Sequence, residues 1–152
     1  MRKYELAEFL TGVVTQDKYD RWLQRKSATH VKRDRQRGNR GAKIADYKIA
    51  IHNAVMRSEG LDSYTKEKLH WNLLSKWSNE EAKNRGRQHK REFYLLPTVD
   101  HVGDGSGEPE FKICAMLTNH VKSDLSREEL LDLCEKLLRA AGRWAGSPNV
   151  LK

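Results

Sequence analysis

Residues 98–122 read TVDHVGDGSGEPEFKICAMLTNHVK, and this segment predicts a β-hairpin that leads into a helix. The β-prone run from Phe93 to Val102 indicates a first strand, and Phe111 to Cys114 indicates the returning strand. Between the strands, residues 103–109 form a cluster of Gly, Asp, Ser, Glu and Pro that is typical of a turn. The first strand therefore carries an Asp-His pair, residues 100–101, toward the mouth of a loop.

The polar residues of this segment have the chemistry of a metal site. Asp100 offers a carboxylate oxygen and Asn119 an amide oxygen, which are ligands that hard divalent cations prefer. His101 can accept a proton from water near neutral pH. Together the three groups form a minimal set for metal-assisted hydrolysis of a phosphodiester bond. An isolated Asp-His pair is usually an ordinary loop pair, so the hypothesis depends on the strands, loop and helix around it.

Length, composition and charge restrict the class of protein. A chain of 152 residues fits one domain, with or without a helical extension, and can bury a core without disulfides. The charged content of 33% and the net charge of +8 favour a polyanionic partner, and here nucleic acid is expected. No segment approaches the ~20 apolar residues that span a bilayer, so no membrane partner is expected.

The cysteines and the N-terminus predict the compartment. Cys114 and Cys134 are too few for a disulfide framework or an all-cysteine zinc site, and both stand at apolar positions where buried thiols are expected. The first residues lack the apolar stretch of a secretory signal. We therefore expect a reducing, cytoplasmic setting.

Outside the hairpin the sequence is mainly helical. Apolar spacing predicts a helix that begins after Thr15, a second over residues 42–58 and a third over residues 69–82. Ser126 and Glu129 have the spacing of a capping box, which predicts a further helix that ends near Gly142.

Two basic stretches are candidates for contact with nucleic acid. Residues 21–43 contain nine Lys or Arg and one acidic residue, Asp34. Residues 83–91 contain five Lys or Arg and no acidic residue, and they are expected to form a solvated loop. Such clusters contact phosphates more than bases. The residues expected to bind nucleic acid are Arg25, Lys26, Lys32, Arg33, Arg35, Arg37, Arg40, Lys83, Arg85, Arg87, Lys90 and Arg91.

The hairpin pattern resembles the HNH endonucleases, a family with a ββα-metal core. The resemblance covers about residues 98–138, and its features are a hydrophobic residue on each side of Asp-His and an Asn-x-x-Lys pattern after the second strand. Upstream, residues 64–69 are similar to the Tyr-Thr-Gly-Glu turn that often precedes the family motif. The matching residues are Val99-Asp100-His101-Val102, Phe111-Lys112-Ile113-Cys114 and Asn119-His120-Val121-Lys122.

The resemblance implies an α+β fold with a ββα-metal hairpin-plus-helix core and a mainly helical, basic N-terminal extension. The implied domains are a basic helical extension over residues 1–60, an HNH-like nuclease core over residues 61–145 and a loose tail over residues 146–152. The basic extension is similar to those of some phage and bacterial members, so the expected cytoplasm is bacterial or phage-like.

The resemblance also implies the roles of the site residues. Asp100 and Asn119 would coordinate one Mg²⁺ or Mn²⁺, and His101 would be the general base for the attacking water. His120 and Lys122 would be additional metal or phosphate contacts. The implied activity is a metal-dependent endonuclease, nicking or restriction-like, that acts on double-stranded DNA and leaves 5′-phosphate and 3′-hydroxyl ends.

Departures from the family pattern keep an alternative function open. Family members usually carry a middle Asn whose side chain braces the loop that holds the catalytic His, and counting back from Asn119 places that position near Glu110 here. Lys66 replaces the Gly of the upstream turn, and two cysteines cannot form the zinc knuckles of many relatives. The alternative is a catalytically degenerate HNH-fold nucleic-acid-binding protein, and a basic protein–protein adaptor is a third reading. The sequence does not decide whether the substrate is DNA or RNA, or what the recognition sequence is. It also does not decide between nicking and double-strand cleavage, or between a monomer and a dimer.

Overall fold

The structure is a computed structural model that describes residues 2–144 and 146. The chain divides into two compact units between Asn119 and His120, and each unit is described by itself. The described residues form six α-helices and one two-stranded antiparallel sheet, so the expected α+β class is confirmed. The tail expected over residues 146–152 lies outside the described residues apart from Gly146.

Two long helices follow a 3₁₀ turn, η1, at Glu8–Leu10. Helix α1 spans Gln16–Gln36, and Thr15 caps it by accepting a hydrogen bond from the backbone N–H of Lys18 at 3.3 Å. Helix α2 spans Ile44–Ser58. The first two of the three helices predicted from apolar spacing are therefore confirmed.

The predicted hairpin is confirmed, with a later start. Strand β1 spans Pro97–Val102 and strand β2 spans Glu110–Ala115, and they pair in antiparallel register. The prediction that the first strand begins at Phe93 is wrong, because residues 93–96 form a turn in which the N–H of Leu96 donates to the carbonyl of Phe93 at 3.0 Å.

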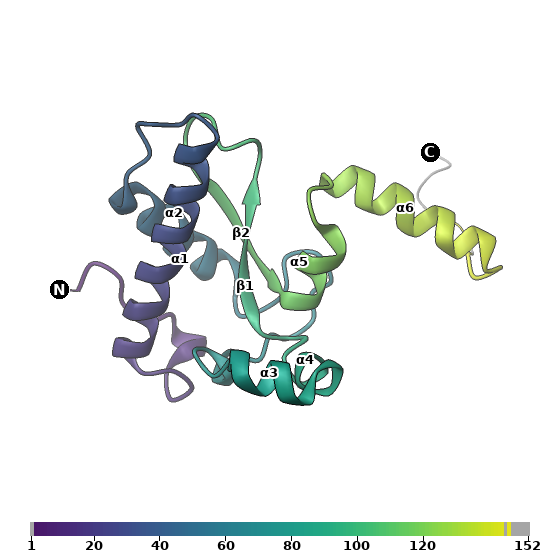
Figure 1. Ribbon diagram of the computed structural model, residues 1–152, viewed down its shortest axis with the longest axis horizontal. Coiled ribbons are helices and arrows are strands. Elements are labelled where there is room, and N and C mark those ends of the chain that lie inside the picture. Colours follow the sequence, from purple (N-terminus) through teal and green to yellow (C-terminus); the bar gives the residue numbers. More distant parts are fainter. Residues whose placement is uncertain (1, 145, 147–152) are drawn as a thin grey trace. The chain divides into compact units, whose positions relative to one another are not determined.

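One face of the hairpin packs on α2, and Phe111 of this face also contacts His30 of α1 (Figure 1). Side chains alternate along a strand, so Val99 and the cross-strand pair His101 and Phe111 share a face. Val99 and Phe111 belong to one buried apolar cluster with Trp22 of α1 and Ile51 of α2. The helices of the expected N-terminal extension therefore share their core with the hairpin, and the first compact unit runs past residue 60.

Residues 69–82 do not form the predicted helix, and this prediction is wrong. The segment contains only a 3₁₀ turn, η2, at Trp71–Leu73, before the next helix begins at Asn79. The N–H of His70 donates to the carbonyl of Leu95 at 2.9 Å, so the chain is tied to the segment before β1 instead of to its own next turn. The apolar side chains are still buried, but from an irregular backbone.

The prediction of a loop over residues 83–91 is also wrong, because two short helices form in this segment. Helix α3 spans Asn79–Arg85 and helix α4 spans Arg87–Glu92. Ser78 caps α3 by accepting from the N–H of Glu81 at 3.2 Å. Acidic residues stand in the first turn of α3 and basic residues in its last, an order that the helix dipole favours.

Helix α5, Met116–Lys122, follows β2 directly and contains the boundary between the two units. Helix α6, Arg127–Ala140, begins with the predicted capping box of Ser126 and Glu129, which is confirmed. The prediction that both cysteines are buried holds for Cys114 and is wrong for Cys134. The second unit is small, and the described part of it leaves apolar side chains of α6 exposed beside Cys134. No helix among residues 2–144 is both long and apolar enough to cross a bilayer.

Candidate functional site

Asp100 and His101 are neighbours on β1 that face opposite sides of the hairpin, as strand alternation requires. Asp100 shares its face with its cross-strand partner Lys112, and its carboxylate accepts a hydrogen bond from the hydroxyl of Tyr64. His101 faces the helices, where its ring lies 5.0 Å from the ring of Phe111 in an edge-to-face contact. Asp100 and His101 are therefore adjacent along the strand, but the carboxylate and the imidazole lie on opposite faces of the hairpin.

A buried carboxylate holds the imidazole of His101. Its Nε2 lies 2.8 Å from Oδ2 of Asp34 on α1, and the hydroxyl of Tyr47 on α2 donates to the same oxygen. Asp34 is fully buried and the His101 side chain is 10% exposed. Burial, followed by the bond to Asp34, raises the pKa of Tyr47, so its hydroxyl stays protonated as a donor. Side chains from α1, α2 and β1 therefore meet at the carboxylate of Asp34.

His30 completes the polar face that α1 turns toward the hairpin. Ser27, His30 and Asp34 are three and four residues apart, so they lie on one side of the helix, and all three are buried. Burial, with smaller effects of neighbouring cations, lowers the pKa of His30 to about 4. His30 is therefore neutral at pH 7 and adds no positive charge beside His101, whose ring centre lies 5.9 Å away.

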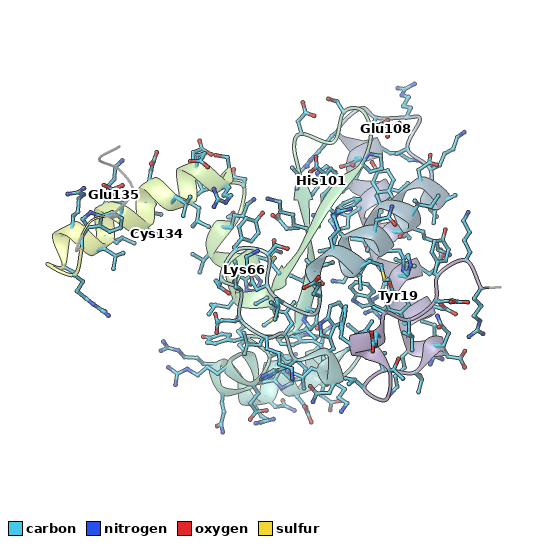
Figure 2. The ribbon with its side chains drawn as sticks, turned by 180° about the vertical axis from the view of Figure 1, so that it is seen from behind. Tyr19, Lys66, His101, Glu108, Cys134 and Glu135 are labelled. Atoms are coloured by element: carbon cyan, nitrogen blue, oxygen red, sulfur yellow. The ribbon has the colours of Figure 1, made fainter. Side chains whose placement is uncertain are left out.

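The hairpin loop covers the polar cluster formed by Asp34, Tyr47, His30 and His101. His101 lies just before the loop that carries Glu108 (Figure 2). The loop and the end of α1 are joined by the side-chain amide of Asn39, which donates to the carbonyl of Gly105 at 2.8 Å. A cavity of about 200 Å³ lies between the loop, Asp34 and His101. The backbone of Gly105 passes so close that an added Cβ would lie 2.6 Å from Oδ1 of Asp34.

Gly105→Ala is expected to destabilise the protein more than Gly103→Ala, by about 1–3 kcal/mol. Both glycines have positive φ, 83° and 85°, so the backbone strain of alanine is matched. A Cβ at Gly103 would meet nothing within 4 Å, whereas at Gly105 it would press on Asp34. Urea unfolding of the two variants measures the difference. Equal midpoints would contradict a close contact between the loop and Asp34.

A second buried carboxylate, Asp62, organises the junction between β2 and α5. Its Oδ2 accepts from the N–H of Ala115 at 2.8 Å and from the hydroxyl of Thr118 at 2.7 Å. Its Oδ1 accepts from the N–H of Tyr64 at 2.7 Å and of Thr65 at 3.1 Å. Asp62 therefore connects the turn whose tyrosine contacts Asp100 with the helical turn that precedes Asn119.

The predicted metal ligands have a suitable donor set. Mg²⁺ is usually bound through one or two carboxylates, with waters and substrate phosphates as its other ligands. Asp100 and Asn119 supply one carboxylate and one amide, and Asn119 is partly exposed on α5. No group of three His, Cys, Asp or Glu that could hold a metal occurs in the described part of the chain. His120 is exposed and Lys122 is buried, and both belong to the second unit.

Most of the predicted nucleic-acid-binding residues are exposed, but three have contacts within the protein. Lys26 is partly buried with its Nζ 3.5 Å from the Thr98 hydroxyl, and burial lowers its pKa. Arg35 donates from Nε and Nη2 to the carbonyl of Ala42 at 3.1 and 2.7 Å. Arg85 pairs with Glu92. The exposed remainder is Arg25, Lys32, Arg33, Arg37, Arg40, Lys83, Arg87, Lys90 and Arg91.

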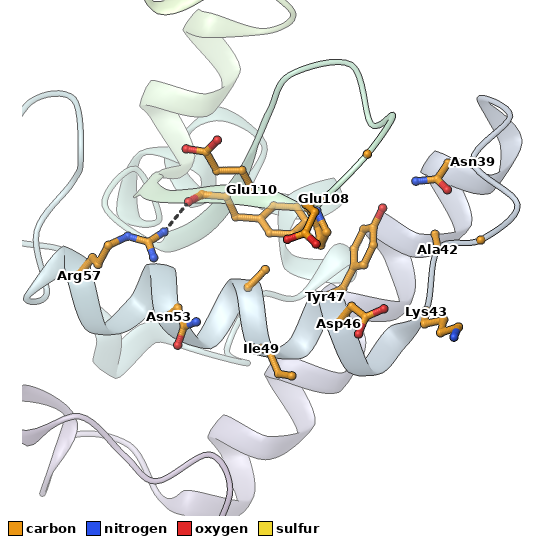
Figure 3. Close-up of a pocket in the computed structure, with 15 residues that line it drawn as sticks. Asn39, Ala42, Lys43, Asp46, Tyr47, Ile49, Asn53, Arg57, Glu108 and Glu110 are labelled. Atoms are coloured by element: carbon orange, nitrogen blue, oxygen red, sulfur yellow. Dashed lines mark hydrogen bonds between the residues drawn. The ribbon is translucent and has the colours of Figure 1, made fainter.

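A groove of about 580 Å³ lies between α2 and the end of the hairpin loop (Figure 3). The Arg57 guanidinium crosses one end of it and donates from Nη2 to the carbonyl of Phe111 at 3.4 Å. Asp46, Glu108 and Glu110 also line the groove. Because these carboxylates oppose its cations, the groove is less suited to a phosphate than the exposed basic surfaces.

Sequence reasoning missed Asp34 and Asp62 as site residues. Asp34 had one visible signal, since it is the single acidic residue in a strongly basic stretch and shares a helix face with His30. Asp62 precedes a turn, and Asp commonly accepts from backbone N–H groups two residues on. Their long-range partners had no local signal. Comparisons of the chain with protein-family models, curated proteins and solved structures found no match.

Proposed function

We propose that the protein is a metal-dependent endonuclease that hydrolyses phosphodiester bonds in double-stranded DNA and leaves 5′-phosphate and 3′-hydroxyl ends. One observation supports this proposal most. The strand that carries Asp100 and His101 belongs to a hairpin that runs directly into the helix carrying Asn119, and a buried carboxylate holds the imidazole of His101.

The opposite facing of Asp100 and His101 suits an in-line displacement. In such a reaction the attacking and leaving oxygens lie on opposite sides of phosphorus. In the described sheet β1 pairs with β2 alone, so its other edge has no strand partner. In the proposed reaction His101 would act on the side of the attacking water and Asp100 on the side of the leaving oxygen. Strand alternation then supplies the separation that the chemistry needs.

The chain's own groups have distinct tasks in this proposal. His101 accepts the proton of the attacking water, and Asp34 balances the positive charge that the imidazole gains. Tyr64 fixes the rotation of the Asp100 carboxylate through its hydrogen bond. Burial, followed by the bond to Asp100, raises the pKa of Tyr64, so its hydroxyl remains a donor at neutral pH. A Mg²⁺ or Mn²⁺ held by Asp100 and Asn119 would neutralise charge on the phosphate and stabilise the leaving oxygen.

The exposed cations of α3 and α4 provide a surface for DNA phosphates. Replacing Lys90 and Arg91 together by glutamine is expected to weaken DNA binding and to reduce the slope of log K against log salt by about 0.9 for each lost phosphate contact. Fluorescence anisotropy with a labelled duplex, in EDTA at several salt concentrations, measures this slope. Lys18→Gln removes an exposed charge near the start of α1 and is the matched control. An unchanged slope in the double variant would remove α4 from the interface.

Incubation of supercoiled plasmid with the purified protein tests the activity. We expect nicked or linear DNA in Mg²⁺ and in Mn²⁺, and intact supercoiled DNA in EDTA. Discrete fragments would indicate sequence specificity, whereas a smear would indicate a non-specific nuclease. Intact plasmid at every metal concentration contradicts the proposed endonuclease.

The alternative is a degenerate member of the same fold that binds nucleic acid without cleaving it. The burial of His101 favours this alternative, since its side chain is 10% exposed and its Nδ1 is enclosed without a hydrogen-bond partner in the described residues. A plasmid that shifts on a gel but stays intact would support it.

A further inference from the structure

Glu110 is not placed to brace the loop that holds His101, the role that the resemblance gives to a middle Asn near this position. The cross-strand partner of Glu110 is Val102, whereas that of His101 is Phe111, so the Glu110 side chain starts on the opposite face of the hairpin. Glu110 is exposed, and its carboxylate points away from Tyr47 (Figure 3). If His101 is braced, another residue must do it.

We infer that Asp34 of α1 is the positioning residue of His101 and makes Nδ1 the atom that accepts the proton of the attacking water. This inference rests on the proposed endonuclease function and deepens it. Helix α1, part of the expected basic extension, would then supply part of the active site.

The chemistry follows from the hydrogen bond between Asp34 and His101. A carboxylate can only accept, so the Nε2 atom 2.8 Å from Oδ2 must carry the hydrogen. A neutral imidazole has one N–H, which leaves the lone pair on Nδ1. When water attacks phosphorus, its oxygen forms the new P–O bond and its proton passes to Nδ1. The bond from phosphorus to the 3′ oxygen breaks, and the departing oxygen takes a proton from solvent. The resulting imidazolium lies beside the negative charge of Asp34.

The surroundings of Asp34 hold the carboxylate in one orientation. Tyr47 donates to Oδ2 from α2, and the backbone of Gly105 passes close to Oδ1. Asp34 is fully buried, so water does not compete for its lone pairs. Nδ1 of His101 is enclosed and has no hydrogen-bond partner among the described residues, so no donor of the protein competes for its lone pair. A fixed carboxylate and one free ring nitrogen are the usual arrangement for a histidine base.

The tautomer of His101 tests the inference without any cleavage. Nitrogen NMR of the full chain, labelled with ¹⁵N-histidine and free of metal, distinguishes a protonated from an unprotonated ring nitrogen. His101→Gln, whose amide can still donate to Asp34, identifies the signal by its loss. We expect Nε2 protonated and Nδ1 unprotonated in the unmodified protein. A His101 ring with the hydrogen on Nδ1 would overturn the inference, and this measurement does not depend on a variant of Asp34 that folds.

Kinetics of Asp34→Asn provide the second test. The variant is expected to lower kcat for plasmid cleavage about 10- to 100-fold while KM and DNA affinity in EDTA stay unchanged. Asp46→Asn makes the same change at an exposed position of α2 and should leave kcat unchanged. A purely structural carboxylate predicts lower stability with normal kcat per folded molecule, and that result would refute positioning.

The two proposals can fail separately. If the unmodified protein does not cut plasmid, the endonuclease proposal fails, and the tautomer alone decides whether Asp34 sets the state of His101. If the unmodified protein cuts and folded Asp34→Asn cuts equally fast, the endonuclease proposal stands and the role of Asp34 is refuted.

Discussion

His101→Gln is expected to lower the rate of metal-dependent plasmid cleavage by about 100- to 10,000-fold, the usual contribution of a general base. Glutamine lacks a basic nitrogen, so it cannot take the proton of the attacking water. Its amide can still donate to Asp34, which avoids leaving a buried carboxylate without a partner. Initial rates of nicking in Mg²⁺, at matched concentrations of folded protein, measure the effect. Alanine would confuse loss of the base with loss of stability.

Two controls separate chemistry from binding in this experiment. DNA affinity in EDTA should be the same for His101→Gln and the unmodified protein, because the basic surfaces are untouched. His70→Ala replaces an exposed histidine outside the cluster and should cut at the normal rate. If His101→Gln keeps a normal cleavage rate, His101 is not the base, even if the protein remains a nuclease.

The elements that could be predicted from sequence are those with local signals. Ser126 and Glu129 are three residues apart and cap their own helix, so the start of α6 depends on neighbours alone. The turn residues of 103–109 likewise fix where the hairpin reverses. Over residues 69–82, apolar spacing without such signals predicted a helix that does not form. There the backbone N–H of His70 donates to the carbonyl of Leu95 and not to a carbonyl of its own helix. Burial alone did not determine the secondary structure there.

The site was predictable in its chemistry and not in its contacts. The opposite facing of Asp100 and His101 follows from strand alternation as soon as the strand is accepted. What each residue meets does not follow, because Asp34 and His101 are 67 positions apart in the chain. A lone acidic residue in a basic stretch was the available hint, but its pairing needed the packing of α1 on the hairpin.

Asp62→Ala is expected to lower the free energy of unfolding by about 2–5 kcal/mol, since each buried donor left without an acceptor costs about 1–3 kcal/mol. The N–H of Ala115 and the hydroxyl of Thr118 both lose their acceptor. The loss is a large share of the total stability of a small protein, which is typically about 5–15 kcal/mol. Urea unfolding followed by circular dichroism measures the change.

A matched control uses another aspartate that caps its own turn. Asp104 accepts from the N–H and the hydroxyl of Ser106 at 2.8 and 2.6 Å, but it is exposed, so water can replace its bonds. Asp104→Ala should therefore unfold near the midpoint of the unmodified protein. Asp62→Asn should lie between the two, because its amide oxygen can still accept from Tyr64 and Thr65 while its NH₂ group faces the N–H of Ala115. Equal midpoints for Asp62→Ala and Asp104→Ala would mean that Asp62 does not brace the junction of β2 and α5.

In the expected case, the brace explains how the position of Asn119 after the strand is fixed. The turn that carries Thr118 is held by a hydrogen bond to Asp62, which lies outside the helix.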